Sequence, residues 1–535
     1  MSSKTFKLSA IAATVFTALS ANAAIYNVTQ YAPEGTNVDT YGVAIQQSAS
    51  GESCWDSGST CPTSDVIAET QKNPQGFNYR DEAPFFLRYG FDYLDDGQDG
   101  FETYCYRFLG YTDSICDDWA SEQWQGYTYE RAGNYDNVIA YSQPIDPSNP
   151  LFIENTAVNA YNQDGTIIGN VRDGSTSRNR AFVGGSLLND DVHTDSDFEA
   201  SHAWAQVSDG SKTYTVGSVS RNNSTRSNTT SSKATIWVNN TANEINWVSA
   251  EADGWVIPQG SARDIVVDGS TIYAVGYNSN DEERLIASVF TSTDSGSTWS
   301  NRFVSNFRYD VEDDYANSVL TSVNENNVAI GTAKMNEARN GAYANTLFYV
   351  PNVASPRYTE FSGSIFFSGA NGKAGAINNF NEVVGTIDYE THREINGNPR
   401  AQRGFIAPLS ISGSANSPRD VFSNTAYYLD DLTNDGSASS SNNQYRIFEA
   451  SDINDAGIIS GTAYYCAGGY DTTAIDSPCS GQTESVVAVQ LTPIADATNA
   501  DIQTRPQTEV TVSRKGGSLN WMLLTILGFI RFRKK

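Results

Sequence analysis

The sequence has few of the residues and motifs that most often carry chemistry near neutral pH. Its 535 residues include three histidines, His193, His202 and His392, and none stands four positions from another, the spacing at which one helix face holds a metal ion. There is no C-x-x-C pair, no H-E-x-x-H, no G-x-S-x-G and no G-x-x-x-x-G-K-[ST]. We therefore assign no catalytic residue, and the sequence favours a protein that is not an enzyme without deciding the question.

Basic residues are also scarce. The chain has 34 Lys and Arg against 62 Asp and Glu, a net charge of −28, which becomes −34 if the basic residues at both ends are removed by processing. Such a surface repels phosphate backbones, so nucleic acid is excluded as a partner. A hydrophobic content of 39% is enough for a packed core and excludes wholesale disorder.

The N-terminus has the three parts of a secretory signal peptide. Two lysines precede an apolar stretch, and Ala21-Asn22-Ala23 then offers a cleavage site for signal peptidase, at the bond between Ala23 and Ala24. We expect residues 1–23 to be removed and the rest of the chain to be exported.

The C-terminus ends in an apolar stretch followed by a basic cluster. The stretch Leu519–Ile530 would span about 18 Å as a helix, shorter than the ~30 Å hydrocarbon layer. The order Gly516-Gly517-Ser518, apolar helix and terminal Arg/Lys resembles the GlyGly-CTERM sorting signal of Gram-negative bacteria, with a plain membrane anchor as the alternative. The resemblance implies cleavage near Gly516 and Gly517 by a rhombosortase-type intramembrane protease. It also implies periplasmic transit with a transient inner-membrane anchor, then release to the cell surface or the medium by the type II secretion machinery. Residues 493–513, before this signal at 514–535, are expected to be a flexible stalk.

The six cysteines fall into three local couples. Export supplies the oxidising compartment that disulfides need, and nearest-neighbour pairing is the simplest of fifteen schemes. We expect structural disulfides between Cys54 and Cys61, Cys105 and Cys116, and Cys466 and Cys479.

One pattern recurs through residues 24–492. A short apolar run ends at an Asn/Asp/Gly turn, a β-branched run follows, and a polar loop leads to a third apolar run, as in AVNAYNQDGTIIGN, SVNENNVAIGTA and SDINDAGIISGTA. The second run of each copy contains a glycine, and these glycines lie 48 to 76 residues apart: Gly169, Gly217, Gly276, Gly331, Gly385 and Gly461. Such periods suit three or four antiparallel strands per unit, so we predict an all-β fold, a β-propeller of about seven blades, with six or eight as alternatives.

Two resemblances agree with this architecture. Ser292–Trp299, STDSGSTW, resembles the Asp-box of sialidase-type propellers, a hairpin turn that is structural in those families. The pattern A-x-x-I-N-x-x-G-x-x-x-G resembles the HAF-type extracellular repeat. With both termini, the chain resembles a family of secreted bacterial proteins that carry a domain of unknown function, which leaves the activity blank.

An acidic segment near the N-terminus is a candidate metal site. Asp92, Asp95, Asp96, Asp99 and Glu102 alternate with glycines in a predicted loop, and hard oxygen ligands of this kind suit calcium. A solvated acidic loop is the alternative. We expect no other cofactor.

Residues 51–141 interrupt the first repeat and are rich in aromatic residues. They form either a disulfide-stapled cap with its own core or a surface that recognises a sugar or a protein, with Trp119 and Trp124 as candidate contacts. The sequence thus favours an exported cell-surface binding protein of unknown ligand, with a glycan and a surface protein as the candidate ligands. A secreted, glycan-acting hydrolase of the sialidase-like propeller type and an envelope structural protein are the alternatives.

Overall fold

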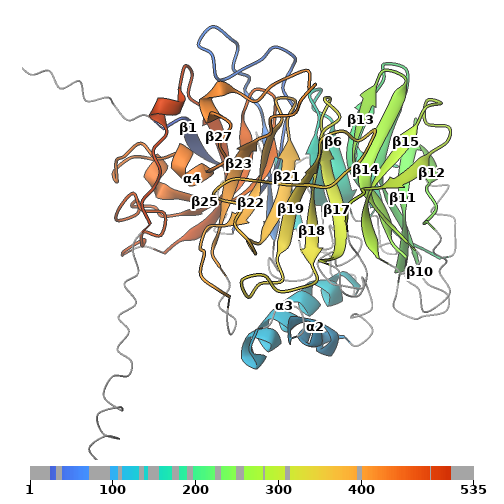
Figure 1. Cartoon of the computed structure of the whole chain (residues 1–535), viewed down its shortest axis with the longest axis horizontal. Coiled ribbons are helices and arrows are strands. Elements are labelled where there is room, and N and C mark those ends of the chain that lie inside the picture. The colour runs from blue at the N-terminus through green and yellow to red at the C-terminus, as the bar shows by residue number, and fades with distance from the viewer. Residues whose placement is uncertain are drawn as a thin grey trace, which may run out of the picture.

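The protein is a ring of antiparallel sheets, which Figure 1 shows from the side. The computed structural model describes residues 24–31, 39–71, 97–106, 111–131, 138–142, 156–171, 180–188, 197–222, 230–248, 258–280, 284–307, 314–394, 400–481 and 483–507. The described residues form six four-stranded sheets, which we call blades 1 to 6, and one three-stranded sheet, which we call the three-stranded sector.

The strands of blades 1 to 3 follow chain order from the axis outward. Blade 1 contains β5 (Thr156–Tyr161), β6 (Ile167–Val171), β7 (Arg180–Val183) and β8 (Ser186–Leu187). Blade 2 contains β9 (Phe198–Ser208), β10 (Thr213–Asn222), β11 (Thr230–Val238) and β12 (Thr241–Glu244). Blade 3 contains β13 (Gly260–Asp268), β14 (Thr271–Ser279), β15 (Leu285–Ser292) and β16 (Ser300–Phe303).

The ring closes by pairing the two ends of the folded chain. Blade 4 contains β17 (Tyr315–Val323), β18 (Ala329–Met335), β19 (Asn345–Val350) and β20 (Thr359–Glu360). Blade 5 contains β21 (Gly372–Ile377), β22 (Glu382–Asp388), β23 (Gln402–Pro408) and β24 (Tyr427–Tyr428). Blade 6 contains β25 (Tyr445–Ile453), β26 (Ile459–Tyr465), β27 (Ser485–Pro493) and, as its outermost strand, β1 (Tyr26–Tyr31), which pairs antiparallel with β27.

The remaining part of the ring corrects the predicted blade number to six rather than about seven. Between blade 6 and blade 1 lies only the three-stranded sector of β2 (Tyr41–Ile45), β3 (Val66–Gln71) and β4 (Val138–Ser142). The insertion between β3 and β4 carries helices α2 (Gln98–Tyr104) and α3 (Asp113–Arg131). The predicted all-β propeller is confirmed, whereas these helices were not predicted.

The hydrophobic core is divided among the junctions between neighbouring sheets. One cluster joins blades 2 and 3 through residues such as Val216 and Ala262, and another joins blades 5 and 6 through residues such as Ile406 and Ile447. Each blade is therefore stabilised mainly by the apolar area that it buries against its two neighbours. This pattern explains why no single repeat could fold alone.

The chain that follows β27 packs onto blade 6. Residues 494–507, which we expected to begin a flexible stalk, include the 3-10 helix η5 (Asn499–Asp501) and the buried Arg505. The backbone N–H of Arg505 donates to Asp431 Oδ1 at 2.7 Å, and its Nε donates to the carbonyl oxygen of Asp430 at 2.7 Å. Both aspartates belong to the short helix α4 (Leu429–Leu432) beside blade 5.

Several terminal predictions fall outside the described residues. They are the signal peptide with Ala23, the remaining part of the predicted stalk, and the sorting signal with Gly516, Gly517 and its short membrane helix. Among the helices that the structure describes, none is both long enough and apolar enough to cross a membrane.

Candidate functional site

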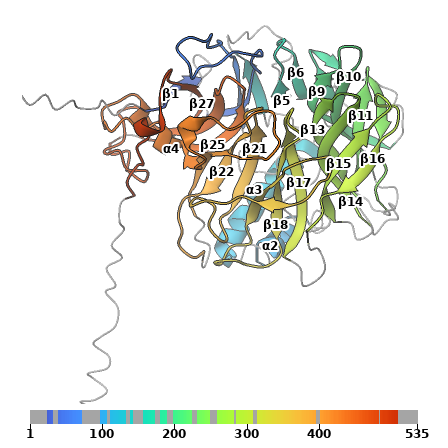
Figure 2. The same cartoon turned by 45° about the horizontal axis from the view of Figure 1, so that its top comes forward.

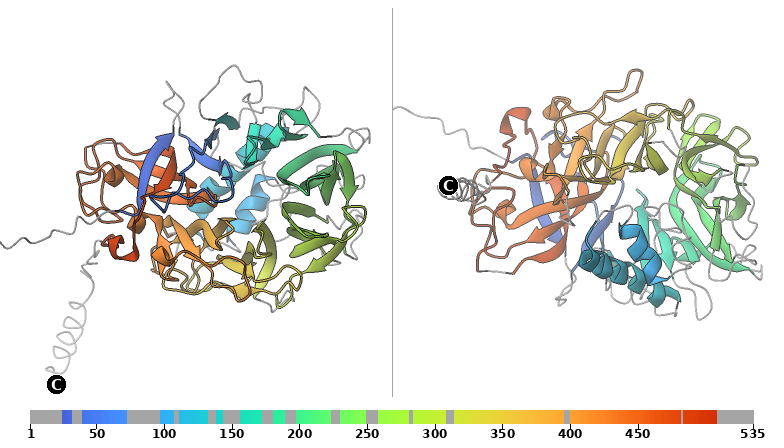
Figure 3. Two further views of the ribbon diagram at one scale, coloured as in Figure 1. Left: turned by 90° about the horizontal axis from the view of Figure 1, so that it is seen from above. Right: turned by 60° about the horizontal axis from the view of Figure 1, so that its bottom comes forward.

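The innermost strands of all the sheets surround one axial cavity of about 1720 Å3. Helices α2 and α3 lie on one side of the ring and are seen through its centre from the other side (Figures 2 and 3). Residues of both helices line the cavity, so the insertion forms the floor of an axial funnel.

A β-bulge in each innermost strand turns one residue toward the axis. The register between the first and second strand shifts at the same place in every sheet, and a bulge of this kind re-aims the side chain of the extra residue. All of these bulge residues line the cavity: Val43, Asn159, Trp204, Arg263, Thr321, Gly375 and Ser451.

The repeat glycines identified in the sequence stand opposite these bulges. A Cβ atom on Gly169 would collide with the carbonyl oxygen of Ala157, and one on Gly331 would collide with that of Val319. In the other four copies, a Cβ atom on the glycine would collide in the same way with a backbone carbonyl oxygen, that of His202, Ser261, Lys373 or Glu449. In each case the blocking carbonyl lies two residues before the bulge residue. The repeated glycine is therefore required by the bulge that builds the cavity wall.

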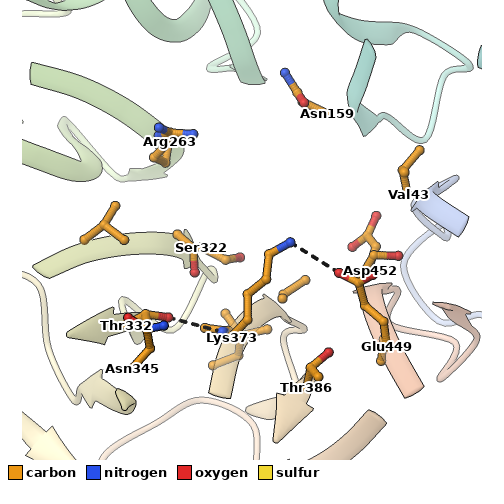
Figure 4. Close-up of a pocket in the computed structure, with 18 of the residues that line it drawn as sticks. Val43, Asn159, Arg263, Ser322, Thr332, Asn345, Lys373, Thr386, Glu449 and Asp452 are labelled. Carbon is orange, nitrogen blue, oxygen red and sulfur yellow. Dashed lines mark hydrogen bonds and ion pairs between the residues drawn. The ribbon is translucent and has the colours of Figure 1, made fainter. Parts of the chain in front are cut away.

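The wall carries charged and aromatic side chains from separate blades. The guanidinium carbon of Arg263 lies 3.8 Å from the ring centre of Trp204, which holds the guanidinium plane against the neighbouring blade. Arg263, Asn159 and Lys373 are directed into the cavity from different strands (Figure 4). Lys373 Nζ pairs with Glu449 Oε1 at 3.2 Å.

Aromatic rings form the floor and an adjacent wall. Tyr104 of α2 stacks on Trp119 of α3, with ring centres 5.9 Å apart and planes 22° apart, and both residues line the cavity. The predicted disulfide Cys105–Cys116 joins the two helices beside this pair. On the wall, Phe448 and Tyr464 pack with ring centres 4.6 Å apart.

The floor lies near charged groups of blade 5. Burial, followed by the charges of Glu394 and Asp388, raises the pKa of Tyr111 to about 12. Asp388 itself forms a buried ion pair with Arg400 at 3.2 Å. Burial raises the pKa of Asp388 to about 6, against hydrogen bonds that lower it.

Two half-buried carboxylates that line the cavity join one sheet to the next. Asp264 accepts hydrogen bonds from Val323 N at 2.8 Å and Ser322 Oγ at 2.9 Å, both in blade 4. Asp452 accepts one from Ile45 N of the three-stranded sector at 3.0 Å. Burial raises their pKa values to about 6 and about 7 respectively. Since backbone donors already occupy these oxygens, the two groups serve as links between sheets.

The asparagines of the repeat turns form a second set of links at the other end of the funnel. Asn324 donates its side-chain amide to the carbonyl oxygen of Asn378 at 2.8 Å, and Asn378 donates to that of Asn454 at 3.3 Å. The side-chain oxygens of Asn324 and Asn378 also accept backbone N–H groups of their own turns. One side chain thus shapes the turn and joins neighbouring blades.

The sequence-predicted residues have different outcomes. All three nearest-neighbour disulfides are confirmed: Cys54–Cys61, Cys105–Cys116 and Cys466–Cys479. The predicted Asp-box is a turn between β15 and β16, where Asp294 accepts hydrogen bonds from Thr298 and Ser292 that lower its pKa to about 2.

The predicted calcium site is described only in part. Asp92, Asp95 and Asp96 lie outside the described residues, whereas Asp99 and Glu102 lie in α2 rather than in a loop. Among the described residues, no group of three or more His, Cys, Asp or Glu side chains could hold a metal ion.

The two tryptophans are separated by the structure. Both are half-buried and lie near the ring of Phe101, at 6.1 Å for Trp119 and 6.2 Å for Trp124, but of the two tryptophans Trp119 lines the cavity and Trp124 does not. The wall residues Arg263, Lys373 and Glu449 were missed by the sequence analysis. Arg263 is the bulge residue of its repeat, and Lys373 and Glu449 each stand two residues before the bulge residue of theirs. Counting back from the turn of each repeat would therefore have identified these positions.

Residues 213–535, more than half of the chain, match a family described as "Protein of unknown function (DUF3466)". The chain belongs to this family. No curated protein matches it.

Solved structures resemble this DUF3466 protein only weakly. The GH93 α-L-arabinofuranosidase of Fusarium graminearum has 11% identity and a TM-score of 0.31, with 62% of this chain and 90% of that chain covered. The α-L-arabinanase of Penicillium chrysogenum has 8% identity and a TM-score of 0.30, with 62% and 90% covered. A putative glycosidase from Bacteroides thetaiotaomicron has 9% identity and a TM-score of 0.24, with 56% and 87% covered. At these scores the likeness bears on neither substrate nor activity.

Proposed function

We propose that this DUF3466 protein is an exported binding protein that holds a carbohydrate chain in its axial funnel. The observation that carries the proposal is the combination of a floor of stacked aromatic rings, Tyr104 and Trp119, with a wall of polar bulge residues. Sugars offer C–H faces that pack on aromatic rings and hydroxyls that bond to amides and charged groups, so such pockets suit them.

The sequence supports the location that this function needs. The signal peptide and the GlyGly-type tail would deliver the funnel to the outer surface after processing by signal peptidase and a rhombosortase-type protease. Three disulfides agree with an oxidising compartment. On this proposal the charge of −28 keeps polyanions such as nucleic acids away from the funnel.

A glycan-acting hydrolase is the second candidate, because Arg263, Tyr41 and Glu449 all line the funnel. Glycoside hydrolysis needs two carboxyl groups on either side of the scissile bond. Glu449 is paired with Lys373, and Asp264 and Asp452 are engaged by backbone donors, so binding accounts better for the state of these groups.

The test is binding of the purified, full-length protein to an array of neutral and acidic oligosaccharides. We expect retention of at least one oligosaccharide class, and Trp119→Ala should weaken it by at least ~10-fold, as for a central aromatic contact. Trp247→Ala, which removes a half-buried tryptophan that does not line the funnel, is the matched control. Release of shortened sugars during the assay would favour the hydrolase, and no retention of any sugar would refute the proposal.

A further inference from the structure

A recess between blades 4 and 5 opens from the funnel. It is lined by Thr332 and Lys334 of β18, Asn345 at the start of β19, Lys373 of β21 and Thr386 of β22, and we call it the blade 4–5 recess. Figure 4 shows Thr332, Asn345, Lys373 and Thr386 around the same part of the cavity. Apart from Lys373, which belongs to the innermost strand of blade 5, these side chains come from second and third strands, so the recess reaches outward from the axis.

Two polar atoms of the recess lack partners. Within the described part of the chain, Asn345 Oδ1 and Thr386 Oγ1 are buried and form no hydrogen bond, and Thr386 is 7% exposed. The Asn345 amide nitrogen donates to Asn371 Oδ1 at 3.1 Å, which fixes its side chain so that Oδ1 is left over as an acceptor. Leaving such groups unsatisfied costs about 1–3 kcal/mol each, a cost that a ligand with suitable hydroxyls would remove.

A donor lies in the same recess. Lys334 is 4% exposed, and its Nζ donates to the carbonyl oxygen of Tyr343 at 2.5 Å. An ammonium group has three hydrogens, so others remain for a ligand. Burial lowers the pKa of Lys334 to about 8, which leaves the group mostly protonated at neutral pH.

The charges around the recess balance one another. Lys373 pairs with Glu449 at 3.2 Å, and Arg400 pairs with Asp388 at 3.2 Å. Glu394 is close enough to Lys334 to raise its pKa against the effect of burial. A recess with three cations matched by three carboxylates has no net charge to attract a uronate or a phosphate.

We propose that the blade 4–5 recess is a subsite for one neutral sugar unit, whose adjacent hydroxyls donate to Asn345 Oδ1, exchange a hydrogen bond with Thr386 and accept from Lys334. Sugar hydroxyls both donate and accept, which matches one acceptor, one hydroxyl and one cation side by side. This inference rests on the proposed function and narrows its ligand to neutral, hydroxyl-rich glycans.

The test compares Thr386→Val and Asn345→Leu with the unchanged full-length protein. The probes are an array of neutral hexose and pentose oligosaccharides and of uronic-acid oligosaccharides, followed by calorimetric titration with the tightest neutral oligosaccharide. Thr235→Val is the matched control, because Thr235 is a fully buried threonine of β11 that does not line the funnel.

We expect neutral oligosaccharides to be retained and each recess variant to bind about 3- to 10-fold more weakly, the effect of one lost hydrogen bond. Thr386→Val should keep the melting temperature, since its hydroxyl has no partner to lose, so this variant remains informative if Asn345→Leu fails to fold. Unchanged affinity in Thr386→Val, or retention of uronic-acid oligosaccharides alone, would overturn the subsite and leave the proposed function standing. Retention of no sugar would overturn both.

Discussion

Gly276 of β14 lies directly against the carbonyl oxygen of Ser261 in β13, where a Cβ atom has no room. That carbonyl stands two residues before Arg263, the residue that the bulge of β13 turns into the funnel. A glycine in one strand thus sets the direction of a charged side chain in its neighbour.

Gly276→Ala should therefore destabilise the protein. The added methyl group must displace the backbone of β13, which costs about 1–3 kcal/mol in a packed interior. Chemical denaturation measures the change in the free energy of unfolding. Gly58→Ala is the control, because nothing lies near its Cβ position and it should change stability little. Equal stability of the two variants would contradict this account of the repeat glycine.

The carboxylate links Asp264 and Asp452 should make the stability of the protein depend on pH. Their folded-state pKa values, about 6 and about 7, are raised above the ordinary value near 3.9 by burial. The folded state therefore binds more protons between these values, so the contribution of both groups is fully present below about pH 4 and is lost as the pH rises through 6 and 7.

Thermal unfolding between pH 4 and pH 8 measures this effect. Asp452→Asn should flatten the decline, because the amide cannot ionise. Asp294→Asn, at an exposed turn residue whose pKa is lowered, should leave the decline as it is. A decline that is equally steep in Asp452→Asn and in the unchanged protein would show that other groups cause it.

The disulfide Cys105–Cys116 should matter for binding more than for the stability of the ring. It joins α2 to α3 beside Tyr104 and Trp119, whereas the blades are held together by clusters of their own. The double variant Cys105→Ser/Cys116→Ser should lose most glycan binding and unfold within a few degrees of the unchanged protein. Cys466→Ser/Cys479→Ser is the control, since this disulfide lies beside blade 6 and should affect stability rather than binding.

Arg505 should contribute to the stability of blade 6. Its Nη1 donates to Asn443 Oδ1 at 3.1 Å and to the carbonyl oxygen of Thr473 at 3.0 Å. Arg505→Ala leaves these buried acceptors unpaired, which costs about 1–3 kcal/mol for each group, whereas Asp430 keeps its ion pair with Arg403. Denaturation curves of Arg505→Ala and of Arg302→Ala, at an exposed arginine, test this expectation. If the two variants had the same denaturation curve, the contacts of Arg505 would contribute nothing to the stability of the ring.

The sequence predicted the repeats because each copy carries its own local chemistry. Turn asparagines such as Asn324 and glycines such as Gly331 are required by the geometry of every copy, so they recur and can be recognised. The disulfide partners were predictable for a similar reason, since each pair closes a short loop.

The funnel residues could not be found in the same way. The residue types at the positions of Arg263, Lys373 and Asn345 differ from one copy of the repeat to the next. Each of these side chains contacts a different neighbour, either across the axis or across the junction between two blades. Helices α2 and α3 were missed because aromatic and acidic residues conceal any helical period in the insertion. Arg505 was missed because the polar composition of its segment resembles that of a linker, and only the buried carboxylates of another blade show where it packs.

The pairing of β1 with β27 determines when the ring can form. The first strand to emerge during synthesis has no partner until nearly the whole chain has been made. Blade 6 must therefore assemble last, and the ring of sheets around the funnel stays open until β1 has paired with β27. Any export machinery that acts on the folded protein therefore meets a ring that closed only after its last strands were made.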